Sequence, residues 1–231
     1  MLELKKIETG YGKKQVLFGL SMKVQEGKIV AIIGPNGAGK STILKAVCGL
    51  IPTWKGEICF DNIRVNGSSP AKSVKRGITF CPQGNRVFDE LSVVENLQVG
   101  GIHLRPKELQ DGIDRVLQLF PVLKDRLRQS AGSLSGGEQQ MLALGRSLVT
   151  KPKLLMLDEP SLGLSPSLVS TVFERISLIN QDMGIAILIV EQKVRQVLEF
   201  CHSVYGIKLG KVVFEGTPKN LADSKLEKIF L

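Results

Sequence analysis

The chain has 231 residues, and its 31 Lys and Arg outnumber its 22 Asp and Glu to give a formal net charge of +9. This length suits one domain with an added lobe and excludes a tandem copy of a large module, because domains take about 100 to 200 residues each. Hydrophobic residues make up 43% and charged residues 23%, a globular composition that excludes wholesale disorder.

The positive charge favours an anionic partner without identifying it. Aromatic residues are only 5% of the chain and it has no arginine-rich run, so we expect no nucleic-acid partner. Apolar stretches such as Ile185–Val190 are far shorter than the roughly 18 to 20 residues that cross a bilayer, and Met1–Glu8 has no leader pattern. We therefore expect a cytoplasmic protein. The 4 cysteines form no CxxC pair, which predicts buried thiols.

The first part of the chain has the pattern of antiparallel strands. Leu2–Glu8 and Leu20–Val24 alternate apolar and polar residues with a period of two. Glu57–Phe60 and Ile63–Val65 flank the turn pair Asp61–Asn62. These segments predict hairpins in a small β subdomain.

Fully apolar runs predict a parallel sheet that is buried on both faces. They are Ile29–Ile33, Leu154–Leu157 and Ile185–Val190. Between these runs the spacing becomes helical, near Ser92–Leu97, Pro106–Phe120 and Gly137–Val149. We expect one α/β domain with a mostly parallel sheet, an antiparallel β subdomain and an inserted α-helical subdomain. Residues 1–84 and 151–231 would form the core, and 85–150 the helical subdomain.

A glycine-rich segment joins the strand Ile29–Ile33 to the helical stretch Ile43–Leu50. Its residues are Gly34, Pro35, Asn36, Gly37, Ala38, Gly39, Lys40, Ser41 and Thr42. Glycines let the backbone aim its N–H groups at phosphate oxygens, the lysine neutralises the β- and γ-phosphates, and Ser41 is placed for magnesium. The strand–loop–helix context favours this P-loop over a chance glycine-rich turn.

Two adjacent carboxylates, Asp158 and Glu159, follow the strand Leu154–Leu157. Open α/β sheets bind ligands at the carboxyl ends of their strands. We expect Asp158 to orient magnesium and Glu159 to accept a proton from the attacking water. The alternative is a solvated acidic turn before Pro160.

Ser135 and Glu138 fit the capping box that begins a helix. A cap does not explain Gly136 and Gly137, because glycine in a first turn costs about 1 kcal/mol relative to alanine. A helix amino terminus with close backbone approach is an anion site, so we expect a second phosphate contact here, with a simple cap as the alternative.

Together, Gly34–Thr42, Leu134–Glu138 and Asp158–Glu159 resemble the ATP-binding subunit of an ATP-binding cassette (ABC) transporter, over essentially the whole chain. The resemblance implies ATP and Mg²⁺ as ligands. It also implies a head-to-tail dimer in which Ser135, Gly136 and Gly137 of one protomer close on the ATP held by the P-loop of the other.

Further roles follow from the same resemblance. Tyr11 would stack on adenine, with packing on the β subdomain as the alternative. Gln83 would reach magnesium or water and report the γ-phosphate to the helical subdomain, unless it is an ordinary loop amide. Ser161–Leu164 resembles the D-loop, which touches the partner subunit.

Two positions depart from the family pattern. Gln192 follows Glu191 where most relatives have a switch histidine, so its amide can bond a γ-phosphate but cannot carry an imidazolium charge. Ser165 stands where many relatives have the D-loop aspartate. Both departures put the rate of ATP turnover in question.

Leu134–Leu148, Asp158–Pro166 and Val190–Gln192 resemble the second (F-type) ATPase of branched-chain amino-acid importers. This resemblance implies permease transmembrane subunits, a second ABC ATPase or another copy of the chain, an indirectly acting solute-binding protein, and the cytoplasmic face of the cell membrane. A urea or short-amide importer, an exporter and a soluble non-transport ABC ATPase are the alternatives.

The segment Asn85–Asn96 is where transporter ATPases receive the permease, by the same resemblance. Phe88, Leu91 and Val93 would line such a groove, or would instead belong to the core of the helical insertion.

Overall fold

The buried apolar strands form one six-stranded sheet in the order β10-β9-β3-β8-β7-β6. In this computed structural model, which describes residues 1–84 and 86–230, every neighbouring pair is parallel except the antiparallel pair β9 and β10. The strands are β3 (Ile29–Ile33), β6 (Ile78–Cys81), β7 (Leu154–Asp158), β8 (Ala186–Val190), β9 (Ser203–Lys208) and β10 (Lys211–Gly216). Every residue of β3, β7 and β8 is buried, which confirms the predicted central strands.

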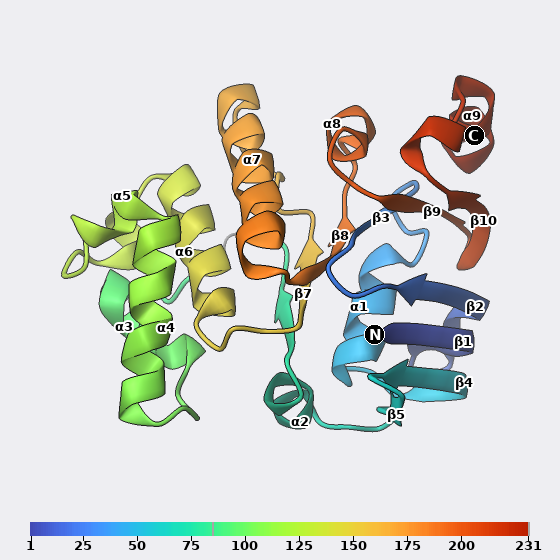
Figure 1. The fold of residues 1–231 in the computed structure, drawn as a ribbon. Coiled ribbons are helices and arrows are strands. Elements are labelled where there is room, and N and C mark those ends of the chain that lie inside the picture. The colour runs from blue at the N-terminus through green and yellow to red at the C-terminus, as the bar shows by residue number, and fades with distance from the viewer. Residues whose placement is uncertain (85, 231) are drawn as a thin grey trace.

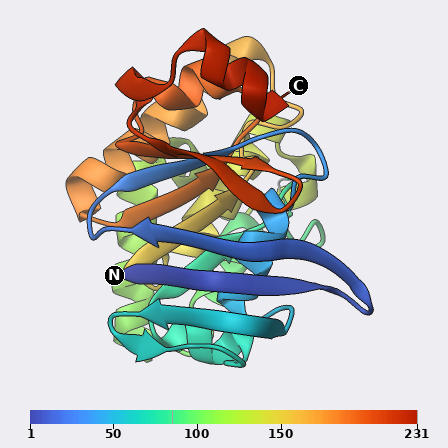
Figure 2. The ribbon, with the colours of Figure 1, turned by 90° about the vertical axis from the view of Figure 1, so that its right-hand side faces the viewer.

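A second, antiparallel sheet lies beside the first in the order β2-β1-β4-β5 (Figures 1 and 2). Its strands are β1 (Leu2–Tyr11), β2 (Lys14–Val24), β4 (Thr53–Phe60) and β5 (Ile63–Arg64). Asp61 and Asn62 have φ values of 49° and 63°, as a two-residue hairpin turn requires. The first hairpin is longer than predicted, because register shifts between Ile7, Thr9 and Gly10 interrupt the alternation on which the prediction depended.

The predicted helical insertion lies between β6 and β7 in the chain and gathers on the side away from the antiparallel sheet (Figure 1). Its helices are α3 (Val93–Gly100), α4 (Pro106–Leu119), α5 (Pro121–Lys124), the short 3₁₀ helix η1 (Ala131–Ser133) and α6 (Gly136–Leu148). Local signals set their starts: Ser92 and Glu95 form a capping box before α3, and Pro106 occupies the first turn of α4.

The remaining helices lie outside the helical insertion. They are α1 (Lys40–Cys48), α2 (Pro70–Lys75), α7 (Pro166–Met183), α8 (Val194–Leu198), η2 (Pro218–Asn220) and α9 (Asp223–Phe230). Residues of β3 alternate between two cores: Ile29, Ala31 and Ile33 pack with residues of α6 and α7, whereas Val30 and Ile32 pack with residues of α1 and the antiparallel sheet. Burial on both faces holds the central strands rigidly, so the loops at their carboxyl ends start from fixed positions.

The cysteines are free thiols in the structure. Cys48, Cys81 and Cys201 are buried as predicted, and burial raises the pKa of these thiols to about 12, 11 and 12. Cys59 differs from the prediction and is only partly buried, because it alternates along β4 with the buried Ile58 and Phe60 and so lies on the opposite face of the strand. No helix in the described part of the chain is both long enough and apolar enough to span a bilayer.

Candidate nucleotide-binding site

The P-loop connects the end of β3 at Ile33 to the start of α1 at Lys40. Gly34 has a φ of 151°, and a Cβ there would lie 2.1 Å from the carbonyl oxygen of Ile207, so the neighbouring strand β9 excludes any side chain. Gly39 has a φ of 101° and caps α1 without a side-chain hydrogen bond. The first turn of α1 therefore keeps backbone N–H groups available to an anion, as the sequence predicted.

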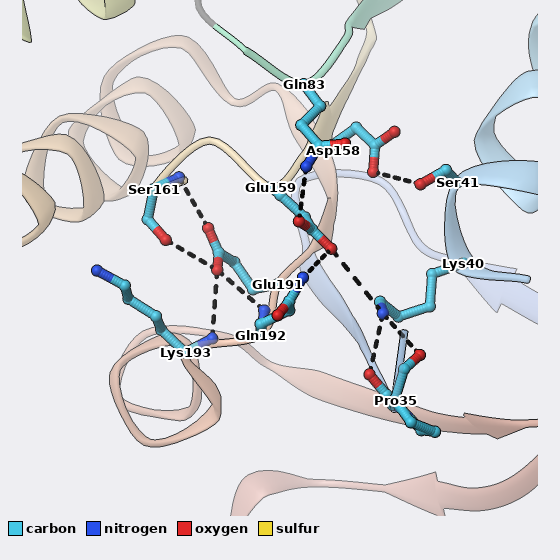
Figure 3. Close-up of polar contacts among 11 residues, drawn as sticks. Pro35, Lys40, Ser41, Gln83, Asp158, Glu159, Ser161, Glu191, Gln192 and Lys193 are labelled. Atoms are coloured by element: carbon cyan, nitrogen blue, oxygen red, sulfur yellow. Dashed lines mark hydrogen bonds and ion pairs between the residues drawn. The ribbon is translucent and has the colours of Figure 1, made fainter. Parts of the chain in front are cut away.

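Lys40 is buried inside this loop. Its Nζ donates hydrogen bonds to the carbonyl oxygens of Gly34 at 2.9 Å and Pro35 at 3.0 Å, and lies 3.9 Å from Oε1 of Glu159 (Figure 3). Burial lowers the pKa of Lys40, and the charges of Glu159 and Asp158 oppose that shift. The P-loop thus holds the Lys40 ammonium beside the amino terminus of α1, where phosphate oxygens would bind.

Ser41 and Asp158 form the second feature of the site. The Ser41 hydroxyl, in the first turn of α1, donates a 2.8 Å hydrogen bond to Oδ1 of Asp158 at the end of β7. Burial raises the pKa of the Asp158 carboxyl, and the bond from Ser41 opposes this rise. A hydroxyl and a carboxylate in contact are hard oxygen donors of the kind that Mg²⁺ prefers.

Glu159 is at the centre of the site (Figure 3). Its backbone has a left-handed φ of 49°, and its N–H donates to the carbonyl oxygen of Val190 at 2.9 Å. Its Oε2 accepts a 3.0 Å bond from Nε2 of Gln83, and its Oε1 accepts a 2.7 Å bond from Nε2 of Gln192. Strained backbone of this kind clusters at functional sites, and here it directs the carboxylate between the two amides.

A cavity of about 640 Å³, within the size range of small-molecule sites, borders the P-loop and Glu159. Asp158 lines a second cavity, which shares Ser41 and Gln83 with the first. The first cavity is lined by Tyr11, Lys14, Val16, Asn36, Gly37, Gly39, Lys40, Ser41, Thr42, Gln83, Glu159, Leu162 and Gln192. The Tyr11 ring is 44% exposed, and its hydroxyl lies 3.4 Å from Oγ1 of Thr42. The structure thus brings Tyr11 to the first cavity, together with Leu162 of the expected D-loop. It also adds Lys14 and Val16, two residues that the sequence analysis does not select.

The structure places the second glycine motif outside this cavity, at the start of α6. Ser135 and Glu138 form the predicted capping box, with the Ser135 N–H donating to Oε2 of Glu138 at 2.9 Å. A Cβ on Gly137 would lie 2.8 Å from Cδ2 of Leu168 on α7, so packing within the chain accounts for that glycine. A Cβ on Gly136 would meet no atom within 4 Å. The expected contact of Ser135, Gly136 and Gly137 with ATP held by a second subunit stays a prediction.

The residues of the expected permease-docking segment differ in burial, and some lie at the surface whereas others lie in the core. Phe88 is 48% exposed, and its ring lies beneath the guanidinium of Arg146, 4.8 Å from the ring centre. Leu91 is partly buried, but Val93 is completely buried in the core. For Val93 the structure confirms the alternative, a core residue of the helical insertion, and excludes a place in a surface groove. Asn85 lies outside the described residues.

Sequence reasoning gave no role to Glu191, although the structure buries its carboxylate between two loops of the site. The signal was present, since a charged residue directly follows a fully apolar strand, as Asp158 and Glu159 do.

The α/β fold, the P-loop and the adjacent carboxylates define a P-loop nucleoside triphosphatase. A family model described as ABC transporter matches residues 17–162 of the chain, which is more than half of its length. The chain therefore belongs to the ABC transporter family, and it is an ATP-binding ATPase subunit of an ABC transporter. The predicted family and fold class are confirmed.

Two branched-chain amino acid transport ATP-binding proteins are similar to the chain over nearly its whole length. The chain is 43% identical over 217 residues to the high-affinity branched-chain amino acid transport ATP-binding protein BraG of Pseudomonas aeruginosa, covering 94% of this chain and 93% of BraG. It is 38% identical to the probable branched-chain amino acid transport ATP-binding protein LivF of Archaeoglobus fulgidus, covering 99% and 98% of the two chains. A solved ATP-binding cassette of an ABC transporter, MJ1267, superposes with a TM-score of 0.90 at 30% identity, covering 99% and 98%.

Proposed function

We propose that the cavity binds Mg²⁺-ATP and that Glu159 is the general base for its hydrolysis. Lys40 and the P-loop amides would hold the β- and γ-phosphates, and Tyr11 would contact the adenine. Glu159 carries this proposal, because two amides each donate to one of its oxygens, Lys40 lies 3.9 Å from Oε1, and the carboxylate keeps further acceptor capacity for a water. The fully buried β7 and β8 hold this carboxylate beside the P-loop.

Ser41, Asp158 and Gln83 would hold the Mg²⁺ ion. Their oxygen donors suit this ion, and the Ser41–Asp158 hydrogen bond already brings two of them together. When bound, Mg²⁺ supplies positive charge that offsets the charge developing on the phosphate oxygens.

The helical insertion would contact two other subunits, a second ATPase and the permease. Ser135, Gly136 and Gly137 would close on ATP held by a second ABC ATPase subunit, either another copy of this chain or a different one. Their place at the amino terminus of α6 supports this arrangement, because a helix amino terminus attracts anions. Phe88 and Leu91 would receive the permease at the cytoplasmic face of the cell membrane, with residues 1–84 and 151–231 acting as the nucleotide-binding core and 85–150 as the helical subdomain.

The transported solute that we propose is a branched-chain amino acid, because BraG and LivF are named for that solute and cover nearly the whole chain. A solute-binding protein would act through the permease and not touch this subunit. Uptake of labelled leucine, isoleucine and valine by cells that lack this chain tests the proposal. We expect the wild-type chain, but not Glu159→Gln, to restore uptake. Restored urea uptake instead, or restored export, would contradict the proposed solute or direction.

Gln192 leads to a prediction about pH. Its amide does not titrate, whereas a histidine would gain a proton below a pH of about 6.5 and attract the Glu159 carboxylate away from water. In Gln192→His, we expect kcat relative to the wild type to fall several-fold as the pH is lowered from about 8 to about 5.5. Steady-state pH profiles measure this ratio, with the exposed Gln181→His on α7 as the control. A ratio that stays constant with pH would contradict a direct contact with the base.

A further inference from the structure

The Glu191 carboxylate is 1% exposed and accepts four hydrogen bonds (Figure 3). Oε1 accepts from the backbone N–H of Ser161 at 3.0 Å, and Oε2 accepts from the Ser161 hydroxyl at 3.0 Å. Oε2 also accepts from the backbone N–H groups of Gln192 at 3.0 Å and Lys193 at 3.3 Å. All four donors are neutral N–H or O–H groups.

These bonds join the two loops that leave neighbouring strands of the sheet. β7 and β8 are parallel, with Asp158 opposite Val190 in their register. Glu159 and Ser161 follow β7, whereas Glu191 and Gln192 follow β8. Among the described residues, the bond from the Glu159 N–H to the Val190 carbonyl is the one that continues the backbone pairing of β7 and β8 past the strands. Beyond that point, side chains join the loops: the Glu191 carboxylate accepts from Ser161, and the Gln192 amide donates to Glu159.

Burying the Glu191 carboxylate costs free energy, which indicates that this residue has a role beyond packing. Burying a carboxylate is unfavourable unless hydrogen bonds compensate for the lost water. Burial raises the pKa of Glu191, and the bonds from Ser161, Lys193 and Gln192 oppose the rise. An apolar residue would avoid this cost, but in the described part of the chain it would leave only the Glu159 backbone bond to Val190 and the Gln192 side-chain bond to Glu159 between the two loops. The arrangement therefore favours a role in positioning the residues that these loops carry.

The loops after β7 and β8 carry residues that line the cavity. The Gln192 side chain donates to Glu159, and Leu162, next to Ser161, lines the cavity and is 45% exposed. Because the backbone N–H of Gln192 is itself held by Glu191, the position of the amide that contacts Glu159 depends on this carboxylate.

We propose that Glu191 is a positioning residue that fixes Gln192 relative to Glu159 by holding it against the loop 161–164. This inference depends on the proposed function, since it assumes that Glu159 is the base. Glu191 touches neither the cavity nor a phosphate site, and it acts through Gln192. Its loss should therefore lower kcat and leave the affinity for ATP nearly unchanged.

Glu191→Gln tests the proposal with almost no change of shape. The amide keeps one acceptor oxygen but turns an NH₂ group toward N–H donors, so part of the connection is lost. We expect kcat to fall about tenfold or more with less than about a twofold change in KM for ATP. Glu199→Gln, an exposed matched change at the end of α8, should behave as the wild type.

A double-mutant cycle with Gln192→Ala separates positioning from general loosening of the fold. If Glu191 acts through Gln192, Glu191→Gln should reduce kcat little further in the Gln192→Ala background, whereas a merely structural role gives independent losses that multiply. Multiplying losses, or a kcat within about twofold of the wild type in the single variant, would overturn the proposal.

Two additions keep the test decisive. Ser161→Ala removes only the hydroxyl donor and should show a weaker form of the same kcat effect, which covers the case in which Glu191→Gln does not fold. An unchanged kcat in Ser161→Ala would then count against the proposal. Glu159→Gln is assayed in parallel: retained hydrolysis in that variant rejects the base assignment, whereas its loss together with an active Glu191→Gln rejects the positioning role alone.

Discussion

Replacing Glu159 with glutamine is expected to lower kcat for ATP hydrolysis by about 100-fold or more, since general-base catalysis contributes roughly 10² to 10⁴. The change keeps the size of the side chain and one acceptor oxygen for the Gln83 or Gln192 amide. An amide cannot take a proton from water at neutral pH. The P-loop and the Ser41–Asp158 pair are untouched, so ATP binding should persist.

The experiment combines two readouts on one variant. Phosphate release at saturating ATP reports kcat, and light scattering after size-exclusion chromatography reports whether ATP causes association. We expect the variant to bind ATP and to accumulate as a dimer, because hydrolysis no longer reopens the pair. Glu174→Gln, an exposed matched change on α7, is the control and should turn over normally. A near-normal kcat in Glu159→Gln would reject the assigned role.

Much of this architecture could be predicted because its signals are local. The glycines at 34 and 39 are required by backbone geometry that the strand–loop–helix pattern already indicates, and both have left-handed φ values in the structure. The Ser135–Glu138 capping box is likewise contained within one turn. Signals that depend on pairing were weaker, as the bulged β1–β2 hairpin shows.

The contacts within the site could not be read from the sequence, because they depend on strand order. β6, β7 and β8 are neighbours in the sheet, although the helical insertion separates β6 from β7 in the chain. This adjacency brings Gln83 and Gln192 to opposite oxygens of Glu159. It also makes Glu191 a connection between loops, a role that no spacing in one strand reveals. Val93 shows the reverse case, since a hydrophobic residue after a loop can face either the surface or the core.

Lys40→Ala is expected to weaken ATP binding by about 10- to 100-fold, the range for losing a charge-assisted contact to phosphate. The Lys40 ammonium already bonds to the carbonyls of Gly34 and Pro35 within the phosphate loop. The fold therefore already fixes the position of this ammonium, and little side-chain entropy is lost when a phosphate binds. Hydrolysis should fall further than affinity, since charge on the γ-phosphate oxygens grows during the reaction.

Calorimetric titration with ATP measures the affinity, and Lys45→Ala is the matched control. Lys45 lies on the same helix, α1, but its ammonium is 5.7 Å from the centre of the Tyr11 ring and not in the P-loop. If loss of one positive charge near the cavity were sufficient, both variants would lose affinity equally. A selective loss in Lys40→Ala, with thermal unfolding unchanged, would place the phosphate contact at Lys40. Undiminished affinity in that variant would contradict the P-loop assignment, because no other side chain in the loop carries a positive charge.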